Sequence, residues 1–399
     1  MNFLTLKDMD LEGKKVLVRV DYNVPIKNGI VEEDTRLKAT IPTINFLLEK
    51  KCKIILISHL GRPQKLLKKG VSLEEVKKEL TLKPVAEELT EILGVDVEFV
   101  DDCIDIEIPK DKDIILLENL RFHKEEEENN ENFAKKLAEN SEVYVNDAFG
   151  VSHREQASVF AITKFQPSCA GLLVQKEVEQ LSKLLDPEKP FIALVAGAKK
   201  DKINILNVLA KKVDKILLGG ALANTFLKAK GIEIGSSKFD KGTLESTKET
   251  IKLAGKKIIL PEDAVVADNC NNGANVKTVG IKNIPEKWII LDIGPKTIET
   301  YKENLKDAKT VLWAGPLGAF EMNKFSKGTK EIGEFLGSID AKKVAGGGDT
   351  LAAIDSFDLS ENLSYISTGG GASLEFIGNE GRLPALIQLE KYYNKIKEE

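Results

Sequence analysis

The sequence predicts an α/β protein of two doubly wound parallel-sheet (Rossmann-like) domains, joined by a hinge helix and with a cleft between them. Two observations carry this prediction. Short apolar runs alternate with longer amphipathic stretches, which is the rhythm of βαβ units. The chain has 399 residues, 42% of them hydrophobic, so it is globular and too long for a single core. Two lobes leave a cleft between them as the default ligand site.

Four strands are expected in the first half, and each is an apolar run that ends in glycine or polar residues: KKVLVRVDYNVP, CKIILISHLGRP, DIILLENLRF and EVYVNDAFG. The stretch from Leu73 to Leu93 has helical periodicity. Pro84 interrupts it, because proline lacks a backbone donor and restricts the residue before it. We therefore expect two shorter helices there, with a boundary near Leu82 or Lys83.

A connector helix is expected over residues 171–185, where Leu173, Val178, Leu181 and Leu185 are apolar. Asp186 and Pro187 stop it. This divides the chain into an N-terminal domain of residues 1–170, the connector helix, and a C-terminal domain of residues 186–383.

The second half repeats the same rhythm, so a second parallel sheet is expected. Its strands are predicted within FIALVAGAKK, KILLGGALANTF, KKIILPEDAV, WIILDIGPKT, TVLWAGPLGAF, KKVAGGGDTLAA and LSYISTGGGASLEF.

Composition and charge limit the kinds of partner that the protein is expected to bind. The net charge is −5, with 58 Lys and Arg against 63 Asp and Glu that alternate along the chain, which disfavours binding to nucleic acid. We find neither a membrane span nor an export signal, and expect a cytoplasmic protein. The four cysteines are far apart and lack zinc-ligand spacing, so they are expected to be buried and reduced: Cys52, Cys103, Cys169 and Cys270.

Arginine is unevenly distributed. Only six of the 58 basic residues are arginine, and five of them lie in the first 154 positions, mostly at or just after strand ends: Arg19, Arg36, Arg62, Arg121 and Arg154. All three histidines fall in the same zone. Ligands of open α/β sheets bind beyond the carboxyl ends of the strands, and arginine forms bidentate bonds with carboxylate and phosphate. The first half is therefore predicted to bind a small anion.

The second half has glycine where strands pass into helices, at Gly197, Gly219, Gly220, 346–348 and 369–371. Glycine turns leave helix N-terminal amides open to phosphate. Lys199 and Lys202 follow one turn and Asp349 follows another, so a cation and a magnesium ligand are available beside the same anion. Neither GxxxxGK[ST] nor GxGxxG opening a helix is found, which argues against a P-loop enzyme and a dinucleotide-dependent dehydrogenase. One lobe for an anion and another for a nucleotide suits phosphoryl transfer.

A set of motifs then resembles one family. In chain order they are RVDYNVP, DTR, SHLGRP, LLENLRF, NDAFGVSHR, GAKKDK, GGALANTFLKAKG, LDIGPKT, WAGPLGAFE, GGGDT and STGGGASLEF. Their identity and order, from about Lys15 to Leu389, resemble phosphoglycerate kinase. The resemblance implies reversible, Mg²⁺-dependent transfer of the acyl phosphate of 1,3-bisphosphoglycerate to ADP, giving 3-phosphoglycerate and ATP in glycolysis and gluconeogenesis, in line and after domain closure. It also implies a monomer whose C-terminal segment, residues 384–399, returns to the N-terminal domain.

The resemblance assigns the glycerate substrate to the N-terminal domain. Arg62, Arg121 and Arg154 would bind its 3-phosphate. Asp21 and Asn23 would bond its hydroxyl and neighbouring oxygens, and His59 belongs to the same site. Arg36 would lie at the carboxyl end of the substrate and stabilise the phosphoryl group in flight.

The resemblance assigns the nucleotide to the C-terminal domain. Lys199 would contact the transferred phosphoryl group, Lys202 the nucleotide phosphates, and Glu321 the ribose hydroxyls. Asp349 would coordinate Mg²⁺. Gly347, Gly348 and Thr350 would meet phosphates at a helix start, and Gly348 and Gly371 are placed with Arg36 and Lys199 among the catalytic residues. The adenosine slot would be lined by Gly197, Gly219, Gly220, Gly294, Pro316 and Leu317.

The chain departs from the family pattern in two places near the nucleotide. GAKKDK is one residue shorter than usual, so either Lys199 or Lys200 is the phosphoryl ligand. Ala314 stands where asparagine is common, which removes a polar contact. The connector helix and the segment from Ser367 to Gly371 are the expected hinges.

Two other functions stay open at this point. A two-lobed binding protein would close on a phosphorylated metabolite without reacting it, but Lys199 and Asp349 would then have no reason to face the anion. An oxidoreductase of similar fold would need the dinucleotide fingerprint, which is missing.

Overall fold

The computed structural model describes residues 2–197 and 202–398, and only the backbone of Lys202 and Asn204. The chain divides into two compact units. The first unit comprises Met1–Glu179 and Gly381–Glu399, and the second comprises Gln180–Glu380. Among the described residues, no helix combines the length and apolar character needed to cross a membrane.

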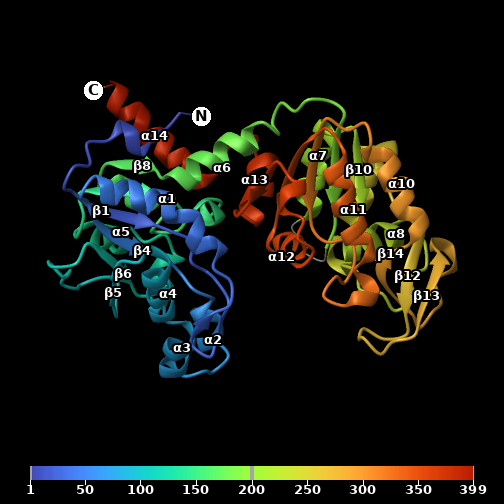
Figure 1. Ribbon diagram of the computed structural model, residues 1–399, viewed down its shortest axis with the longest axis horizontal. Helices are drawn as coiled ribbons and strands as arrows, with labels where there is room; N and C mark the ends of the chain where they lie inside the picture. Colours follow the sequence, from blue (N-terminus) through green and yellow to red (C-terminus); the bar gives the residue numbers. More distant parts are fainter. Residues whose placement is uncertain (1, 198–201, 399) are drawn as a thin grey trace. The chain divides into compact units, whose positions relative to one another are not determined.

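The first unit is built on a six-stranded parallel sheet in the order β5-β6-β4-β1-β7-β8. Its strands are β1 (Lys15–Arg19), β4 (Lys53–Ile57), β5 (Val97–Val100), β6 (Ile114–Leu117), β7 (Val143–Asn146) and β8 (Ser168–Ala170), with a small hairpin of β2 (Ile26–Lys27) and β3 (Ile30–Val31). The helices of this part are α1 (Thr35–Glu49), α2 (Pro63–Leu67), α3 (Leu73–Leu80), α4 (Lys83–Leu93), α5 (Glu131–Ala138), α6 (Leu172–Ser182) and α14 (Pro384–Glu398). Helix α14, from the end of the chain, lies beside β8 (Figure 1).

Helices cover both faces of this sheet, because successive side chains of a strand point to opposite faces. Val16 and Val18 of β1 pack in one cluster with residues of α1 and α4. Leu17, between them, packs in a second cluster with Phe133 and Leu137 of α5. Both sides of the sheet are therefore buried, as in a doubly wound fold. Pro84 falls at the start of α4, so the predicted break between α3 and α4 is confirmed.

The second unit has its own six-stranded parallel sheet, in the order β11-β10-β9-β15-β16-β17. These strands are β9 (Phe191–Val195), β10 (Lys215–Leu218), β11 (Ile258–Ile259), β15 (Thr310–Ala314), β16 (Lys342–Gly346) and β17 (Tyr365–Ser367). The helices are α7 (Lys202–Lys212), α8 (Gly220–Ala229), α9 (Leu244–Ala254), α10 (Pro295–Leu305), α11 (Lys327–Ser338), α12 (Gly348–Ser356) and α13 (Gly371–Gly378). The predicted fold class, with two doubly wound parallel sheets, is confirmed.

A third sheet in the second unit differs from the prediction. Strands β12 (Asp263–Ala267), β13 (Val276–Gly280) and β14 (Ile289–Ile293) pair antiparallel in the order β13-β12-β14. The run WIILDIGPKT was expected in the parallel sheet, but its strand β14 belongs to this sheet. A loop joins β12 to β13, and a connection containing the single 3-10 turn Ile281–Asn283 joins β13 to β14. Such short connections favour antiparallel pairing, because parallel strands need a long crossover. Leu227 of α8 packs on this sheet against Ala264 and Val266.

The connector helix is shorter than predicted. It is α6, which ends at Ser182, and the chain then continues in tight turns in which Leu184 N bonds Leu181 O and Leu185 N bonds Ser182 O. Of the four apolar positions named from the sequence, Leu181 is buried, whereas Leu173, Val178 and Leu185 are only partly buried; Val174 and Leu184 are the other buried positions. The face differs because burial depends on what packs against the helix, which periodicity alone does not specify.

Candidate functional site

The candidate site of the first unit lies at the carboxyl edge of its parallel sheet. Arg19, at the end of β1, is in register with Ile57 of β4 and Asn146 of β7, so these strands end at one edge. The predicted anion-binding residues follow four adjacent strands. Asp21 and Asn23 follow β1, His59 and Arg62 follow β4, Arg121 follows β6, and Arg154 follows β7.

Arg36 enters this edge from the first turn of α1. Its Nη1 donates to Asp21 Oδ2 at 2.9 Å and to the carbonyl oxygen of Asn23 at 3.3 Å. The side-chain oxygen of Asn23 accepts from Gly61 N at 2.9 Å, which ties the loop after β1 to the loop after β4. Arg36 is partly exposed, with 27% of its side chain accessible. The remaining donors of its guanidinium can therefore face a ligand.

His59 is buried and uncharged. Burial lowers its pKa well below the usual range, and the positive charges of nearby arginines, Arg121 first, lower it further. Its Nδ1 lies 3.2 Å from Arg19 Nη2, so it accepts from that guanidinium. Its 3.8 Å approach to Asp21 Oδ1 is then a dipolar contact rather than an ion pair. His59 thus adds no positive charge to the edge.

Arg121 is the most informative of the arginines. Its side chain is only 2% exposed, yet it makes one hydrogen bond, from Nη1 to the carbonyl oxygen of Gly61 at 2.7 Å. Nε and Nη2 are buried without a hydrogen-bond partner, and Glu127 is 3.6 Å from Nε. Burial, followed by repulsion from Arg154, lowers the pKa of Arg121 to about 10, so it remains charged near neutral pH. Buried donors of a charged group are normally satisfied, so this pair indicates an anion that binds there.

The five early arginines form one electropositive cluster with different roles. The charges of Arg19, Arg36, Arg121 and Arg154 all act on His59, and Arg62 acts on Arg154. Arg19 is fully buried, and its donors bond Ser158, His59 and the carbonyl of Val20. Arg19 therefore stabilises the edge through bonds within the protein rather than by binding a ligand. Arg36, Arg62, Arg121 and Arg154 remain as the groups that can bind a phosphate or carboxylate.

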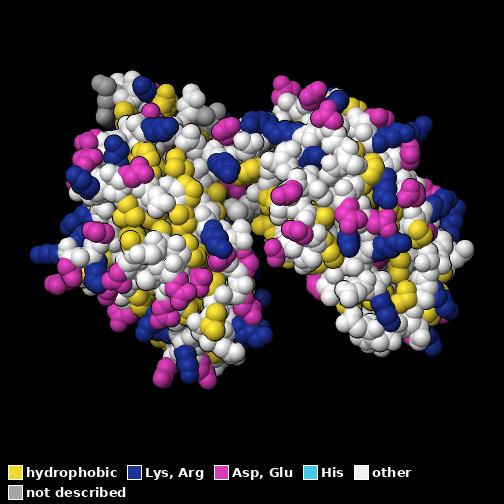
Figure 2. All heavy atoms as spheres, viewed as in Figure 1, with side chains coloured by type: hydrophobic (Ala, Val, Ile, Leu, Met, Phe, Trp, Pro, Cys, Tyr) yellow, Lys and Arg dark blue, Asp and Glu magenta, His cyan; other side chains and the backbone are white. Residues whose placement is uncertain are grey.

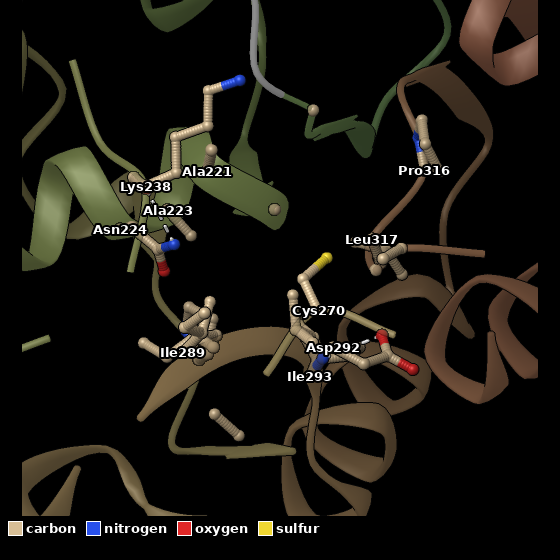
Figure 3. A pocket seen from close by; sticks show the side chains of 18 of the residues that line it. Ala221, Ala223, Asn224, Lys238, Cys270, Ile289, Asp292, Ile293, Pro316 and Leu317 are labelled. Atoms are coloured by element: carbon tan, nitrogen blue, oxygen red, sulfur yellow. Dashed lines mark hydrogen bonds between the residues drawn. The ribbon is translucent and has the colours of Figure 1, made fainter. Parts of the chain in front are cut away.

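The second unit has a candidate site of its own, a cavity of about 550 Å³. Six of the predicted nucleotide-site residues line it: Gly197, Gly220, Pro316, Leu317, Glu321 and Asp349. Figure 3 shows Asn224 and Ala223 of α8 on one side and Pro316 and Leu317 on the other. Ile289 and Ile293 of β14 contribute apolar surface. A slot with apolar walls and a few polar groups suits a planar base with a polar sugar.

The start of α12 adjoins this cavity. Gly347 has φ +113°, a conformation that favours glycine, and it caps the helix. Asp349 lies in the first turn and is exposed. The hydroxyl of Thr350 is buried, accepts from Gly315 N at 2.8 Å and donates to Gly346 O at 2.9 Å. Thr350 therefore holds the turn after β15 against α12, and open amides of the first helical turn are suited to anions.

The other predicted residues fall in three groups. Gly219 and Gly294 are packing positions, since an added Cβ would lie 2.4 Å from Leu317 Cδ2 and 2.2 Å from Asp263 Cγ, respectively. Gly348 and Gly371 are open where a Cβ would lie, with no neighbouring atom within 4 Å. Lys199 and Lys200 lie outside the described residues, and the backbone of Lys202 begins α7.

Sequence reasoning missed most of the cavity lining, including the polar residues Asn224, Lys238 and Cys270. Asn224 lies one turn after Gly220 on α8 and donates from Nδ2 to the carbonyl of Lys238 at 3.1 Å. Lys238 and Cys270 come from loops and also line the cavity. Cys270 is exposed, so the expectation that all four cysteines are buried is wrong for it, although it holds for the other three. The helical spacing from Gly220 could have indicated Asn224, but no local pattern marks the loop residues.

Comparisons with known proteins agree on one family. A model of the phosphoglycerate kinase family matches residues 6–380. A phosphoglycerate kinase of Moorella thermoacetica is 46% identical over 398 residues, which cover 97% of this chain and 98% of that protein. The structure of phosphoglycerate kinase from Coxiella burnetii matches with a TM-score of 0.83 and 38% identity, covering 99% of this chain and 100% of that one. The crystal structure of the Pyrococcus horikoshii OT3 enzyme matches with a TM-score of 0.85 and 32% identity, covering 98% and 99%.

Proposed function

The chain belongs to the phosphoglycerate kinase family, and from this premise we propose that it transfers the acyl phosphate of 1,3-bisphosphoglycerate to ADP. The products are 3-phosphoglycerate and ATP, and the reaction is reversible. We place it in glycolysis and gluconeogenesis, in the cytoplasm, and treat the chain as a monomer that binds small molecules rather than nucleic acid or membrane.

One observation carries the substrate half of this proposal. The Nε and Nη2 donors of Arg121 are buried, charged and without a hydrogen-bond partner at the edge where Arg62 and Arg154 also lie. A phosphate monoester supplies the acceptor oxygens that these donors lack. In this assignment Arg62, Arg121 and Arg154 bind the 3-phosphate, and Asp21, Asn23 and His59 orient the glycerate.

Arg36 takes the role closest to the chemistry. Its bond to Asp21 fixes one side of the guanidinium, which leaves other donors for the carboxyl end of the glycerate. Phosphoryl transfer lowers its barrier mainly through alignment and stabilisation of charge on the moving group. A guanidinium that is already oriented stabilises that charge without reorganisation.

The nucleotide half rests on the cavity of the second unit. Its apolar walls would hold the adenine, Glu321 the ribose hydroxyls, and the start of α12, with Gly347 and Gly348, the phosphates. Asp349 fits a Mg²⁺ site, because proteins usually hold this ion with one or two carboxylates while phosphates and water complete the octahedron. Mg²⁺ would neutralise phosphate charge during transfer. Lys199 or Lys200, with Lys202, completes the proposal for the phosphates.

The two substrates are assigned to different units, so in-line transfer requires a closing step that also excludes water from the acyl phosphate. We propose the connector helix and the segment from Ser367 to Gly371 as the hinges of that step.

The test is a coupled assay with MgATP and 3-phosphoglycerate. Arg36→Ala should keep its melting temperature within a few degrees yet lose about a hundredfold or more in kcat, the loss seen when one preorganised charge-stabilising group is removed. Arg382→Ala, which removes the sixth and exposed arginine, is the matched control. Full activity of the Arg36 variant would refute its role, and an inactive wild-type chain would refute the function.

A further inference from the structure

A second cluster of ligating side chains lies at the far side of the first sheet's carboxyl edge. Asp102 and Cys103 follow β5, and His123 follows β6 and the short turn Leu120–Phe122. β5 and β6 are parallel neighbours, so their carboxyl ends meet. The phosphoryl-transfer proposal uses none of these three residues.

The three side chains converge on one point. Asp102 oxygen, Cys103 Sγ and a His123 ring nitrogen all lie within 4.8 Å of one another, and His123 Nε2 is 2.7 Å from Asp102 Oδ1. Cys103 is only 1% exposed, whereas the side chains of His123 and Asp102 are 26% and 43% exposed. A small ion can therefore reach the buried sulfur from the solvent side, past the imidazole and carboxylate.

The charges around the sulfur favour a cation. The carboxylates of Asp102, Glu126 and Glu118 are the negative charges that act on the Cys103 sulfur. Glu126 accepts from Ser158 N and Oγ, and Glu118 accepts from Leu82 N and Thr81 Oγ1. Those two carboxylates are thus fixed by other bonds and contribute negative potential to the site without competing as ligands. Lys77 is the nearby lysine whose charge acts on Asp102.

We propose that Asp102, Cys103 and His123 bind a thiophilic divalent cation, Zn²⁺ or a metal of similar softness, with water as the fourth ligand. Thiolate, imidazole and carboxylate are the donors that zinc takes, at about 2.0 to 2.3 Å in tetrahedral geometry. Such distances put ligand atoms roughly 3.3 to 3.8 Å apart, which small side-chain rotations reach from the present cluster. The metal replaces the thiol proton, which passes to solvent. Sulfur excludes Mg²⁺ as the preferred occupant, so this site is chemically distinct from the nucleotide site.

Cobalt spectroscopy tests the site directly, since Co²⁺ bound to a thiolate gives a charge-transfer band and tetrahedral Co²⁺ gives visible bands. The full chain carrying Cys270→Ser, which removes the exposed thiol, is freed of metal with a chelator and titrated with CoCl₂. We expect both bands to saturate at one equivalent and to disappear when Zn²⁺ is added.

Adding Cys103→Ser should abolish the charge-transfer band, whereas adding Cys169→Ser, at another buried cysteine, should leave it intact. His123→Gln and Asp102→Asn alter partly exposed positions and should each weaken binding by at least about tenfold, a loss that even an outer partner of a metal ligand can cause. Should the Cys103 variant fail to fold, these two variants decide the question. The proposal is overturned by the absence of a thiolate band, by a band that survives Cys103→Ser, or by unchanged affinity in both the His123 and Asp102 variants.

Discussion

The proposal for the substrate site rests mainly on Arg121, a buried guanidinium whose donors are not all used. The Arg121 side chain makes one hydrogen bond, while its Nε and Nη2 have no hydrogen-bond partner. Arg121→Lys keeps a positive charge but loses the planar fork, and lysine binds phosphate only as a point charge. We expect KM for 3-phosphoglycerate to rise about tenfold or more, the cost of one charged hydrogen bond, while KM for MgATP stays unchanged. Arg382→Lys, outside the cluster, should alter neither constant.

Alanine substitutions at the two glycines that start α12 distinguish backbone strain from obstruction of a ligand. Gly348 begins the helix and has open space around it, so Gly348→Ala should not destabilise the protein. If phosphates approach this backbone, the added methyl group should raise KM for MgATP about tenfold or more, the cost of roughly one lost contact. Gly347→Ala, at φ +113°, should instead lose about 1 to 3 kcal/mol of stability.

Gly378→Ala, in α13 with equally open space, is the control for these glycines and should leave the kinetics unchanged. Unaltered nucleotide kinetics in Gly348→Ala would remove the case for phosphate binding at this helix start.

At the scale of elements, a buried carboxylate bonds the first turn of the connector helix. Asp147 Oδ1 accepts from Leu173 N at 2.9 Å and Val174 N at 3.3 Å. Burial raises the pKa of Asp147 from 3.8 to about 7, against these hydrogen bonds. The folded chain then holds a proton that the unfolded chain has already released above about pH 4. Stability therefore falls as pH rises from about 4 to about 7 and levels off beyond, by up to about 4 kcal/mol.

Asp147→Asn keeps the acceptor oxygen and removes the titration. We expect its urea midpoint, followed by far-UV circular dichroism, to fall less than that of wild type between pH 5 and pH 8. Asp111→Asn, at an exposed position, should reproduce the wild-type slope. Equal slopes for wild type and Asp147→Asn would show that the carboxyl is ionised throughout.

At the scale of the molecule, each unit has its own core, and both tryptophans, Trp288 and Trp313, belong to the second. Leu17→Ala removes a fully buried side chain from the first core, and Leu194→Ala does so in the second. Each should cost about 2 to 5 kcal/mol. We expect Leu194→Ala alone to lower the urea midpoint seen by tryptophan fluorescence, while Leu17→Ala lowers only a separate transition seen by circular dichroism. A common shift of both signals would mean that the units unfold together.

The mixing of positive and negative charges on the surface is the feature at this scale that the composition indicates most directly. On the face of each unit seen in Figure 2, Lys and Arg are interspersed with Asp and Glu, in keeping with the alternation along the chain. The faces drawn there thus carry charges of both signs.

Much of the fold and part of the candidate site could be predicted from the sequence. Parallel strands end at a common edge whatever their side chains, so residues after β1, β4, β6 and β7 were bound to meet once the βαβ rhythm was recognised. For this reason the grouping of Asp21, His59, Arg121 and Arg154 followed from position in the chain. The glycine turns of the second half could be recognised in the same way, although the contacts that they are proposed to make with the nucleotide remain predictions.

By itself, then, the sequence determined two parallel sheets, the break at Pro84, and the arginine-rich edge, because strand periodicity and backbone chemistry are local. Only the tertiary structure decided that Arg19 stabilises this edge through bonds within the protein, that β14 joins an antiparallel sheet, and that Cys270 lines a cavity. It also brought Cys103 to His123 across two neighbouring strand ends. Such neighbours depend on how distant segments pack, and no spacing along the chain encodes that contact.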